Sequence, residues 1–353
     1  MALARLILVT GKGGTGKSAV AAALALALAR RRPTLLVDLD QRMWAARMLG
    51  LESGDASDNH APHRPRTDPI ANPDALANLE TISLSASSEL EAFIERIVPI
   101  KAVARRMLQS RTFGYVSAAL PGLEAFLMLE RLRIISGRAA LEDRFAVVDA
   151  PATGSAIELL SVPGALKQIA PLGTLNRLAA NVESFLADAS RFAVVLTLTP
   201  QELALREALE ASDVLRGRLS VSVAAAALNC VPAPLFSHSD LDELDARGAH
   251  PECVRLARWR AGTGGFAARA RREASRAGLR VVELPMLFSP AMGRAQLEEL
   301  SRTLDAQFFP TKTAQRPKPG KSIRPVKATT PAKPAGLAKP GSSAKSANSA
   351  KSE

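Results

Sequence analysis

The chain has 353 residues, of which 47% are apolar and only 4% aromatic, so it can form a sizeable core built mainly from Ala, Leu, Val and Ile. Its two cysteines, Cys230 and Cys253, are too few for a disulfide framework or a Cys-rich zinc site. Because it shows no signal peptide, and its longest apolar run, Ala19–Ala29, is too short to span a bilayer, we expect a soluble cytoplasmic protein.

The positive charge is concentrated at one end of the chain. Residues 311–353 hold ten Lys or Arg and one acid, which accounts for +9 of the formal net charge of +12 and leaves +3 for residues 1–310. This Lys/Ala/Pro-rich segment has no periodic large apolar residues, so we expect a disordered basic tail. The near-neutral body, residues 1–310, is the expected folded domain, and its charge does not indicate a nucleic-acid-binding domain.

Apolar runs and helical patterns alternate along the body. We expect strands at 5–10, 33–40, 79–85, 145–151, 192–200, 221–231 and 279–287. We expect helices at 18–32 (with arginines in its last turn), 201–216, 264–277 and 293–309, and a helical subdomain at about 88–140 that is interrupted near 113–121. This order predicts an α/β fold with a mostly parallel central sheet flanked by helices.

A glycine-rich loop follows the first strand. Its sequence, Gly11-Lys12-Gly13-Gly14-Thr15-Gly16-Lys17-Ser18, has the spacing of a phosphate-binding loop between a strand and a helix. Its backbone N–H groups would cradle the phosphates, Lys17 would bridge the β- and γ-phosphates, and Ser18 would ligate Mg²⁺. A glycine turn without a ligand is the alternative, and the flanking strand and helix disfavour it.

The second lysine of the loop requires a separate explanation. Lys12 stands at the start of the loop and is expected to face out of the cradle that holds its own nucleotide. From there it could reach the phosphates of a second copy docked face to face, acting in trans as an arginine finger does. We therefore expect a homodimer that closes across the nucleotide, with Lys12 and Lys17 both catalytic.

The loop sequence KGGTGKS resembles the deviant phosphate loop of one class of P-loop ATPases. The class includes ParA/MinD-like positioning ATPases, nitrogenase iron protein and the ArsA-like family of arsenical pump-driving and tail-anchored-protein-targeting ATPases. These proteins are nucleotide-sandwich dimers, so the resemblance implies ATP, Mg²⁺ and a homodimer.

Two further segments favour the ArsA-like family. LLVDLDQ (35–41) places Asp40 where that family has a catalytic aspartate that positions the attacking water, although an Asp-x-Asp pair such as Asp38 and Asp40 also occurs in MinD-like proteins or as a strand-end cap. FAVVDAPATG (145–154) resembles the family's switch II segment and is followed by a helix; Asp149 would support Mg²⁺. Ser155 stands where the family often has His.

The resemblance extends over residues 5–309. Segments 117–132 and 194–210 resemble further family segments, Asn229 matches the position that contacts the adenine edge, and Pro285 lies in a segment beside the base. The nucleotide-binding residues implied are Gly11, Lys12, Gly13, Gly14, Thr15, Gly16, Lys17, Ser18, Asn229 and Pro285, with Ser18 and Asp149 at the metal.

These residues predict a dimeric ATPase switch that couples Mg-ATP hydrolysis to opening and closing on a client protein, with hydrophobic or membrane-associated proteins as one class of client. Two cysteines disfavour arsenite as the cargo. Apolar residues that could line a client groove are Phe93, Ile97, Val103, Met107, Phe126, Met128, Leu129 and Ile135, for which ordinary core packing is the alternative. Alternative functions are a ParA/MinD-like positioning ATPase that binds DNA or membrane through its basic tail, and a non-hydrolysing nucleotide-binding protein.

Overall fold

The computed structural model describes residues 3–39, 43–51, 76–85, 89–90, 122–233 and 235–310. The expected catalytic residue Asp40 lies outside the described residues. So do the basic tail, residues 311–353, and most of the expected helical subdomain before residue 122. The predictions that rest on these segments stay predictions.

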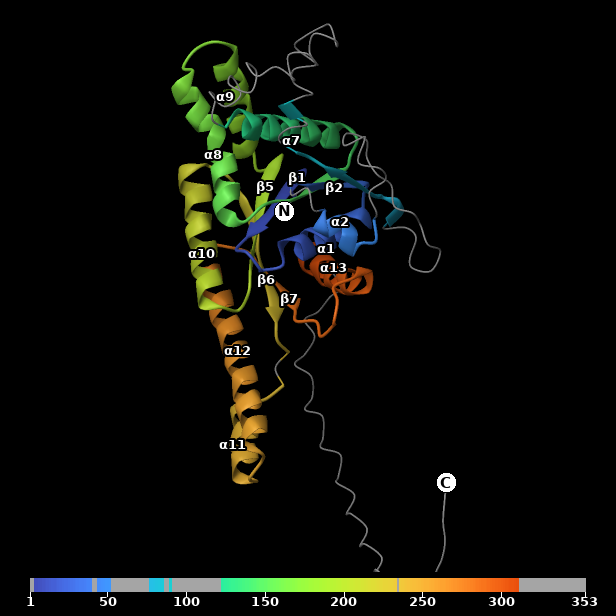
Figure 1. The fold of residues 1–353 in the computed structure, drawn as a ribbon, viewed down its shortest axis with the longest axis vertical. Helices are drawn as coiled ribbons and strands as arrows, with labels where there is room; N and C mark the ends of the chain where they lie inside the picture. The colour runs from blue at the N-terminus through green and yellow to red at the C-terminus, as the bar shows by residue number, and fades with distance from the viewer. Residues whose placement is uncertain are drawn as a thin grey trace, which may run out of the picture. The chain divides into compact units, whose positions relative to one another are not determined.

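Seven strands in the described residues form one sheet in the order β3-β2-β4-β1-β5-β6-β7, and every neighbouring pair is parallel (Figure 1). All seven predicted strands and the predicted parallel sheet are confirmed. The strands are β1 (Leu6–Gly11), β2 (Thr34–Asp38), β3 (Leu79–Ser83), β4 (Phe145–Asp149), β5 (Phe192–Leu198), β6 (Val223–Val231) and β7 (Val281–Pro285). Central strands such as β1 and β5 are buried throughout and mostly apolar because helices cover both faces of the sheet.

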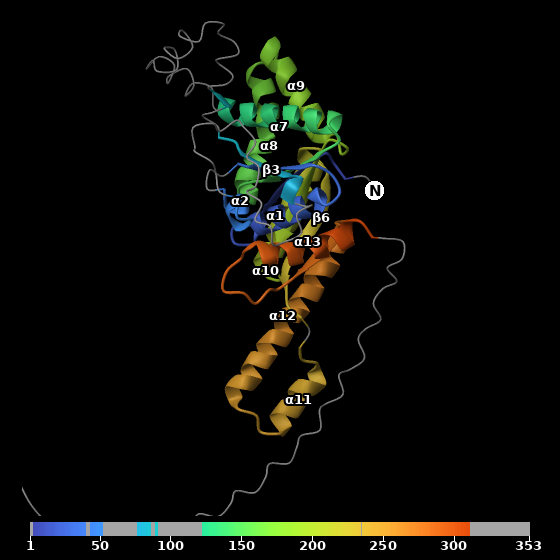
Figure 2. The same cartoon turned by 90° about the vertical axis from the view of Figure 1, so that its right-hand side faces the viewer.

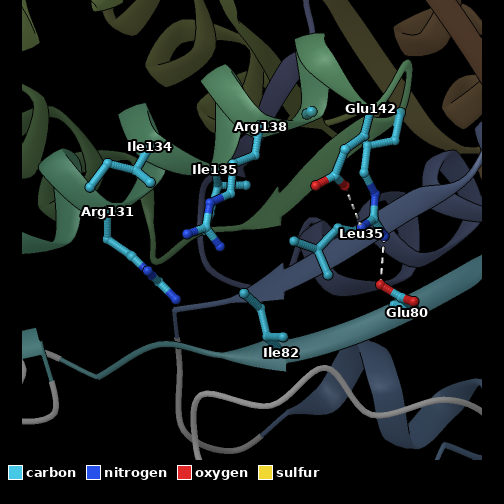
Figure 3. Close-up of a pocket in the computed structure, with 10 residues that line it drawn as sticks. Leu35, Glu80, Ile82, Arg131, Ile134, Ile135, Arg138 and Glu142 are labelled. Atoms are coloured by element: carbon cyan, nitrogen blue, oxygen red, sulfur yellow. Dashed lines mark hydrogen bonds and ion pairs between the residues drawn. The ribbon is translucent and has the colours of Figure 1, made fainter.

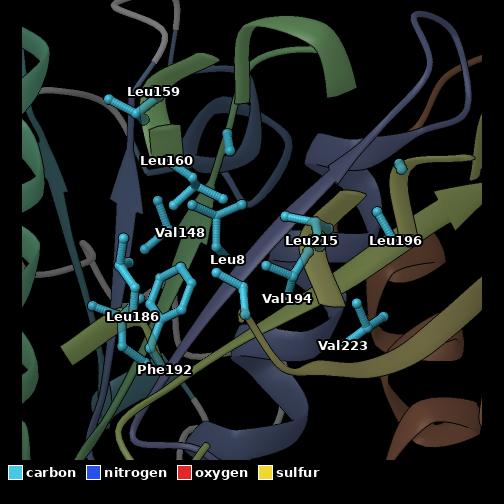
Figure 4. Packing of buried hydrophobic residues seen from close by; sticks show 14 of the residues in the cluster. Leu8, Val148, Leu159, Leu160, Leu186, Phe192, Val194, Leu196, Leu215 and Val223 are labelled. Carbon is cyan, nitrogen blue, oxygen red and sulfur yellow. The ribbon is translucent and has the colours of Figure 1, made fainter. Parts of the chain in front are cut away.

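Helices cover the two faces of the sheet unequally. One face, which includes Leu6 and Leu8 of β1, packs against α7, α8, α9, α10 and α12. Figure 4 shows Leu8 on this face with Leu159 and Leu160 of α8 and Leu186 of α9. The opposite face, which includes Ile7 and Val9, packs against α1, α2 and α13. The helices are α1 (Lys17–Ala29), α2 (Trp44–Met48), α7 (Leu123–Leu141), α8 (Thr153–Ile169), α9 (Thr174–Ala187), α10 (Glu202–Asp213), η1 (Val214–Arg218, a π-helix), α11 (His238–Ala246), α12 (Pro251–Arg276) and α13 (Arg294–Phe308).

The helix that follows the glycine loop, α1, is buried on all sides. Every residue from Ala19 to Ala29 is buried between the sheet and α13. A helix enclosed in this way needs no polar face, which explains its Ala/Leu composition. The arginines predicted in its last turn lie just beyond its end instead, where Arg31 pairs with Asp305 of α13 at 2.8 Å and stacks over Phe309.

The longest described helix, α12, begins 13 residues earlier than the sequence pattern predicted. Pro251 starts the helix and His250 caps it, and it continues through Gly262, Gly264 and Gly265. Those glycines lower helix propensity and obscured its first half in the sequence. With α11 beside it, the first half of α12 forms a hairpin that projects beyond the ends of β6 and β7 (Figures 1 and 2).

Part of the expected client groove is core instead. Phe126, Leu129 and Ile135 of α7 are buried against the sheet, which supports the core-packing alternative for these three residues. The candidates Phe93, Ile97, Val103 and Met107 lie outside the described residues. No helix in the described ranges is long and apolar enough to cross a bilayer.

A cavity of about 130 Å³ lies between α7 and the strands β2 and β3 (Figure 3). Its walls include Leu35, Ile82, Arg131 and Arg138, and Arg144 spans it through ion pairs with Glu80 and Glu142. None of the described residues that line it belongs to the glycine loop, which follows the end of β1. It therefore belongs to a different part of the molecule from the predicted site.

Replacement of Phe185 by Ala should destabilise the fold. Phe185 on α9 is fully buried, and its ring meets that of Phe192 edge to face with centroids 5.3 Å apart. Loss of this ring leaves a cavity, so we expect Phe185→Ala to lower the free energy of unfolding by about 3–5 kcal/mol. Urea denaturation followed by circular dichroism measures the change. The control Leu172→Ala, at a side chain that is 86% exposed, should change the same quantity by less than about 0.5 kcal/mol; equal effects would contradict the packing described.

Candidate functional site

The predicted site residues that the structure describes gather at one edge of the sheet. The glycine loop follows β1, Asp38 and Asp149 end β2 and β4, Asn229 lies near the end of β6, and Pro285 ends β7. All these strands are parallel, so their carboxyl ends share an edge. Ligands of open α/β sheets bind in the crevice outside this edge.

The glycine loop has a conformation that only glycine adopts easily. Gly14 and Gly16 both have φ of 85°, in the left-handed region. A Cβ at Gly13 or Gly14 would meet no atom within 4 Å, so this part of the loop opens to solvent. Backbone N–H groups at such a turn form a concave anion-binding surface, which fits a phosphate group.

The other half of the loop is held tightly by β5. Thr15 is buried, and its hydroxyl donates to the carbonyl oxygen of Lys12 at 2.8 Å and lies 2.8 Å from the hydroxyl of Thr197 on β5. The Thr197 hydroxyl also lies 3.2 Å from the carbonyl oxygen of Thr10. A Cβ at Gly11 would overlap Thr197, so glycine is required where β1 leaves the sheet. These contacts fix where the loop begins and where it turns.

Lys17 and Ser18 form the first turn of α1, directly after the loop. Among the described residues, no side chain caps this helix, so its first N–H groups remain available to an anion. The Lys17 ammonium lies 3.5 Å from the carbonyl oxygen of Lys12, across the mouth of the loop. Helix terminus, ammonium and loop N–H groups together fit a polyphosphate.

Two buried carboxylates stand beside the loop. Asp38 of β2 is the Cα partner of Asp149 of β4, and Asp149 is in turn the partner of Val9 of β1. The hydroxyl of Thr10 donates to the carbonyl oxygen of Pro151 at 2.7 Å, which ties the loop strand to the segment after Asp149. Carboxylate and hydroxyl oxygens suit Mg²⁺, so Asp149 and Ser18 fit the predicted metal, whose remaining positions phosphate and water would fill.

In this structure Asn229 holds the glycine loop. Its side-chain amide donates to the carbonyl oxygen of Thr15 at 2.9 Å, and a Cβ at Gly16 would overlap that amide. One residue later, Cys230 has φ of 57° and β6 carries one more residue than β7 between their paired positions, which is a bulge. The predicted contact of Asn229 with adenine stays a prediction. Pro285 lies across from Val231 just past this bulge.

Lys12 contacts its own subunit. Its ammonium donates to Oε2 of Glu207 on α10 at 2.7 Å, and both side chains are about one-third exposed. The predicted contact of Lys12 with a second copy therefore requires this ion pair to open.

Thr153 is buried in the first turn of α8, and Gly154 and Ser155 follow it there.

Sequence analysis missed two residues that position the loop, Thr197 and Glu207. Thr197 left a weak signal as a polar residue in the otherwise apolar run of β5. Glu207 left none, because an acidic residue on an amphipathic helix is most simply explained by solvent exposure. The contacts of Thr197 with Thr15 and of Glu207 with Lys12 each join residues more than 180 positions apart in the chain.

The chain matches known proteins in a region that includes the glycine loop and the two buried aspartates. The model of a family described as anion-transporting ATPases matches residues 4–191, just over half of the chain. The chain is 25% identical over 218 residues to ATPase BagA of Mycobacterium tuberculosis (strain H37Rv) and to "Putative ATPase Mb3704" of Mycobacterium bovis. Each alignment covers 60% of this chain and 61% of the relative, so the chain spans about three fifths of the length of these relatives. With its glycine loop, buried aspartates and parallel sheet, the chain belongs to the anion-transporting ATPase (ArsA) family and has the fold of a P-loop NTPase.

Proposed function

We propose that the protein binds and hydrolyses Mg-ATP at the glycine loop and closes over it as a homodimer, opening and closing on a partner protein. One observation carries the proposal: an open glycine cradle with Lys17 across its mouth lies next to two buried aspartates at the same sheet edge. Family membership supports the use of ATP.

Binding depends on the parts of the loop that are already in place. The N–H groups of Gly13, Gly14 and Gly16 to Ser18 would donate to the phosphates, and Lys17 would neutralise the charge of the terminal ones. Thr197 and Asn229 hold the loop in position before the ligand arrives, so little ordering remains to be done on binding. Pro285 and Asn229 would border the base.

Hydrolysis requires a positioned water molecule and stabilised charge. Mg²⁺, when bound, supplies charge neutralisation at the phosphates; Ser18 and Asp149 would hold it. Asp40, two residues after Asp38, would orient the water by accepting its hydrogen bond. Lys12 of a second subunit would add positive charge at the transferred phosphate.

An exposed apolar surface supports the partner-binding part of the proposal. On α12, Leu256, Trp259 and Phe266 recur at helical spacing with 63%, 57% and 44% of their surface exposed. Large exposed apolar side chains that share a helix face mark interaction surfaces.

Cys230 and Cys253 are both exposed and free, which supports a reducing compartment such as the cytoplasm.

The two loop lysines should separate into different roles when each is replaced by Ala. Lys17→Ala removes the charge inside the cradle, so we expect ATP binding about 10- to 100-fold weaker by calorimetry. Lys12→Ala should bind ATP within about threefold of wild type but fail to dimerise in analytical ultracentrifugation with Mg-ATP. A Lys12→Ala protein that dimerises normally would refute the trans role.

Asp40→Asn should abolish turnover without abolishing binding. The neutral amide accepts the hydrogen bond of the water less strongly than the carboxylate does, so we expect steady-state phosphate release to fall at least about 100-fold while ATP binding persists. Wild-type turnover should be slow and should stop when EDTA removes Mg²⁺. If the wild type itself releases no phosphate with Mg-ATP, the non-hydrolysing alternative is favoured.

Deletion of residues 311–353 distinguishes the proposed switch from a positioning ATPase. The tail carries +9, so a ParA/MinD-like protein that uses it should lose ATP-dependent binding to DNA or anionic liposomes on deletion. The proposed switch should keep ATP-dependent dimerisation and turnover within about twofold. Cosedimentation with DNA or liposomes, run beside the phosphate-release assay, gives both readouts.

A further inference from the structure

Lys12 and Glu207 form an ion pair within one subunit, at the edge of the candidate site. The ammonium of Lys12 lies 2.7 Å from Oε2 of Glu207, and the two side chains are 37% and 31% exposed. Lys12 follows the end of β1, and Glu207 lies in the second turn of α10. The carbonyl oxygen of the same Lys12 is held by the buried Thr15, so the backbone is anchored while the side chain reaches outward to α10.

We propose that Glu207 holds Lys12 on its own subunit in the absence of nucleotide, and that the phosphates of a partner's ATP replace Glu207 when the dimer closes. The inference rests on the proposed dimeric function and assigns Glu207 as a positioning residue. A lysine ammonium is a compact charge at the end of a flexible stem, so it can leave one anionic partner for another. A triphosphate carries several negative charges against one on Glu207, so the exchange is favoured only when the partner holds nucleotide.

The ion pair is weak enough for bound ATP to displace Glu207 from Lys12. Pairs at this exposure change an equilibrium by about two- to fivefold. A symmetric dimer breaks one pair in each subunit, so the two together should weaken dimerisation by about 4- to 25-fold. That is enough to oppose closure of empty subunits and small enough for bound ATP to overcome.

The acidic residues of α10 offer a matched control for this test. Glu210 is exposed on the same helix, one turn beyond Glu207. Glu202, at the start of α10, pairs with Arg206 at 3.2 Å. Glu210→Gln therefore removes the same charge from α10 as Glu207→Gln does, while the contact with Lys12 stays intact.

The first experiment measures the ion pair in the resting subunit. Full-length wild type, Glu207→Gln and Glu210→Gln are acetylated briefly with acetic anhydride without nucleotide, and modification of Lys12 is quantified by mass spectrometry. We expect Lys12 to react about two- to fivefold faster in Glu207→Gln than in wild type, since the ion pair holds the Lys12 side chain against Glu207 and hinders its reaction with the reagent; Glu210→Gln should match wild type. Equal rates in all three proteins would overturn the proposal.

The second experiment measures the exchange itself. Sedimentation velocity with saturating Mg²⁺ and the non-hydrolysable ATP analogue AMP-PNP should show a dimer dissociation constant about 4- to 25-fold lower for Glu207→Gln than for wild type. An unchanged or higher constant, with analogue binding and thermal unfolding as in wild type, overturns the proposal. A wild type that stays monomeric refutes both the dimeric function and the exchange. In that case, slower acetylation of Lys12 in wild type than in Glu207→Gln would still show the ion pair.

Discussion

The glycine loop owes its position to the close approach of β1 and β5 at Gly11. Any side chain at Gly11 would overlap Thr197, so the two strands can lie this close only because the residue has no Cβ. The Thr197 hydroxyl then meets both the carbonyl of Thr10 and the hydroxyl of Thr15. Asn229 reaches the carbonyl of Thr15 from β6. One steric constraint therefore starts a chain of polar contacts that holds the inner half of the loop.

The loop has a fixed half and a half that can respond. Thr15 is buried and its hydroxyl and carbonyl are both bonded, whereas Gly13 and Gly14 face open space and a partly exposed ion pair holds the Lys12 side chain. Buried, bonded groups resist displacement because their contacts are costly to break, and exposed ion pairs exchange readily. This division suits the proposed site, which would bind a phosphate in a set geometry and also respond to a second subunit.

Helix α10 connects the loop to other parts of the molecule. It packs against α8, whose first turn closely follows Asp149, and against α12, which carries the exposed Leu256, Trp259 and Phe266. If Lys12 leaves Glu207, the helix that loses an ion pair is thus in contact with both α8 and α12. Contiguous packing of this kind is the physical route by which nucleotide state could reach a partner surface.

The amino-acid sequence by itself determined the seven strands, the parallel sheet that their alternation with helices implies, the glycine loop, and the position of Asp149 at a strand end. Each of these depends on a local pattern: a continuous apolar run, glycines at fixed spacing, or a carboxylate at the end of an apolar run. Only the tertiary structure decided that Gly262, Gly264 and Gly265 lie within one continuous helix, that Phe126 and Leu129 are core residues, and that Lys12 meets Glu207. Helix propensity is a weak local preference that packing overrides, and burial and ion pairing depend on residues brought together from distant parts of the chain.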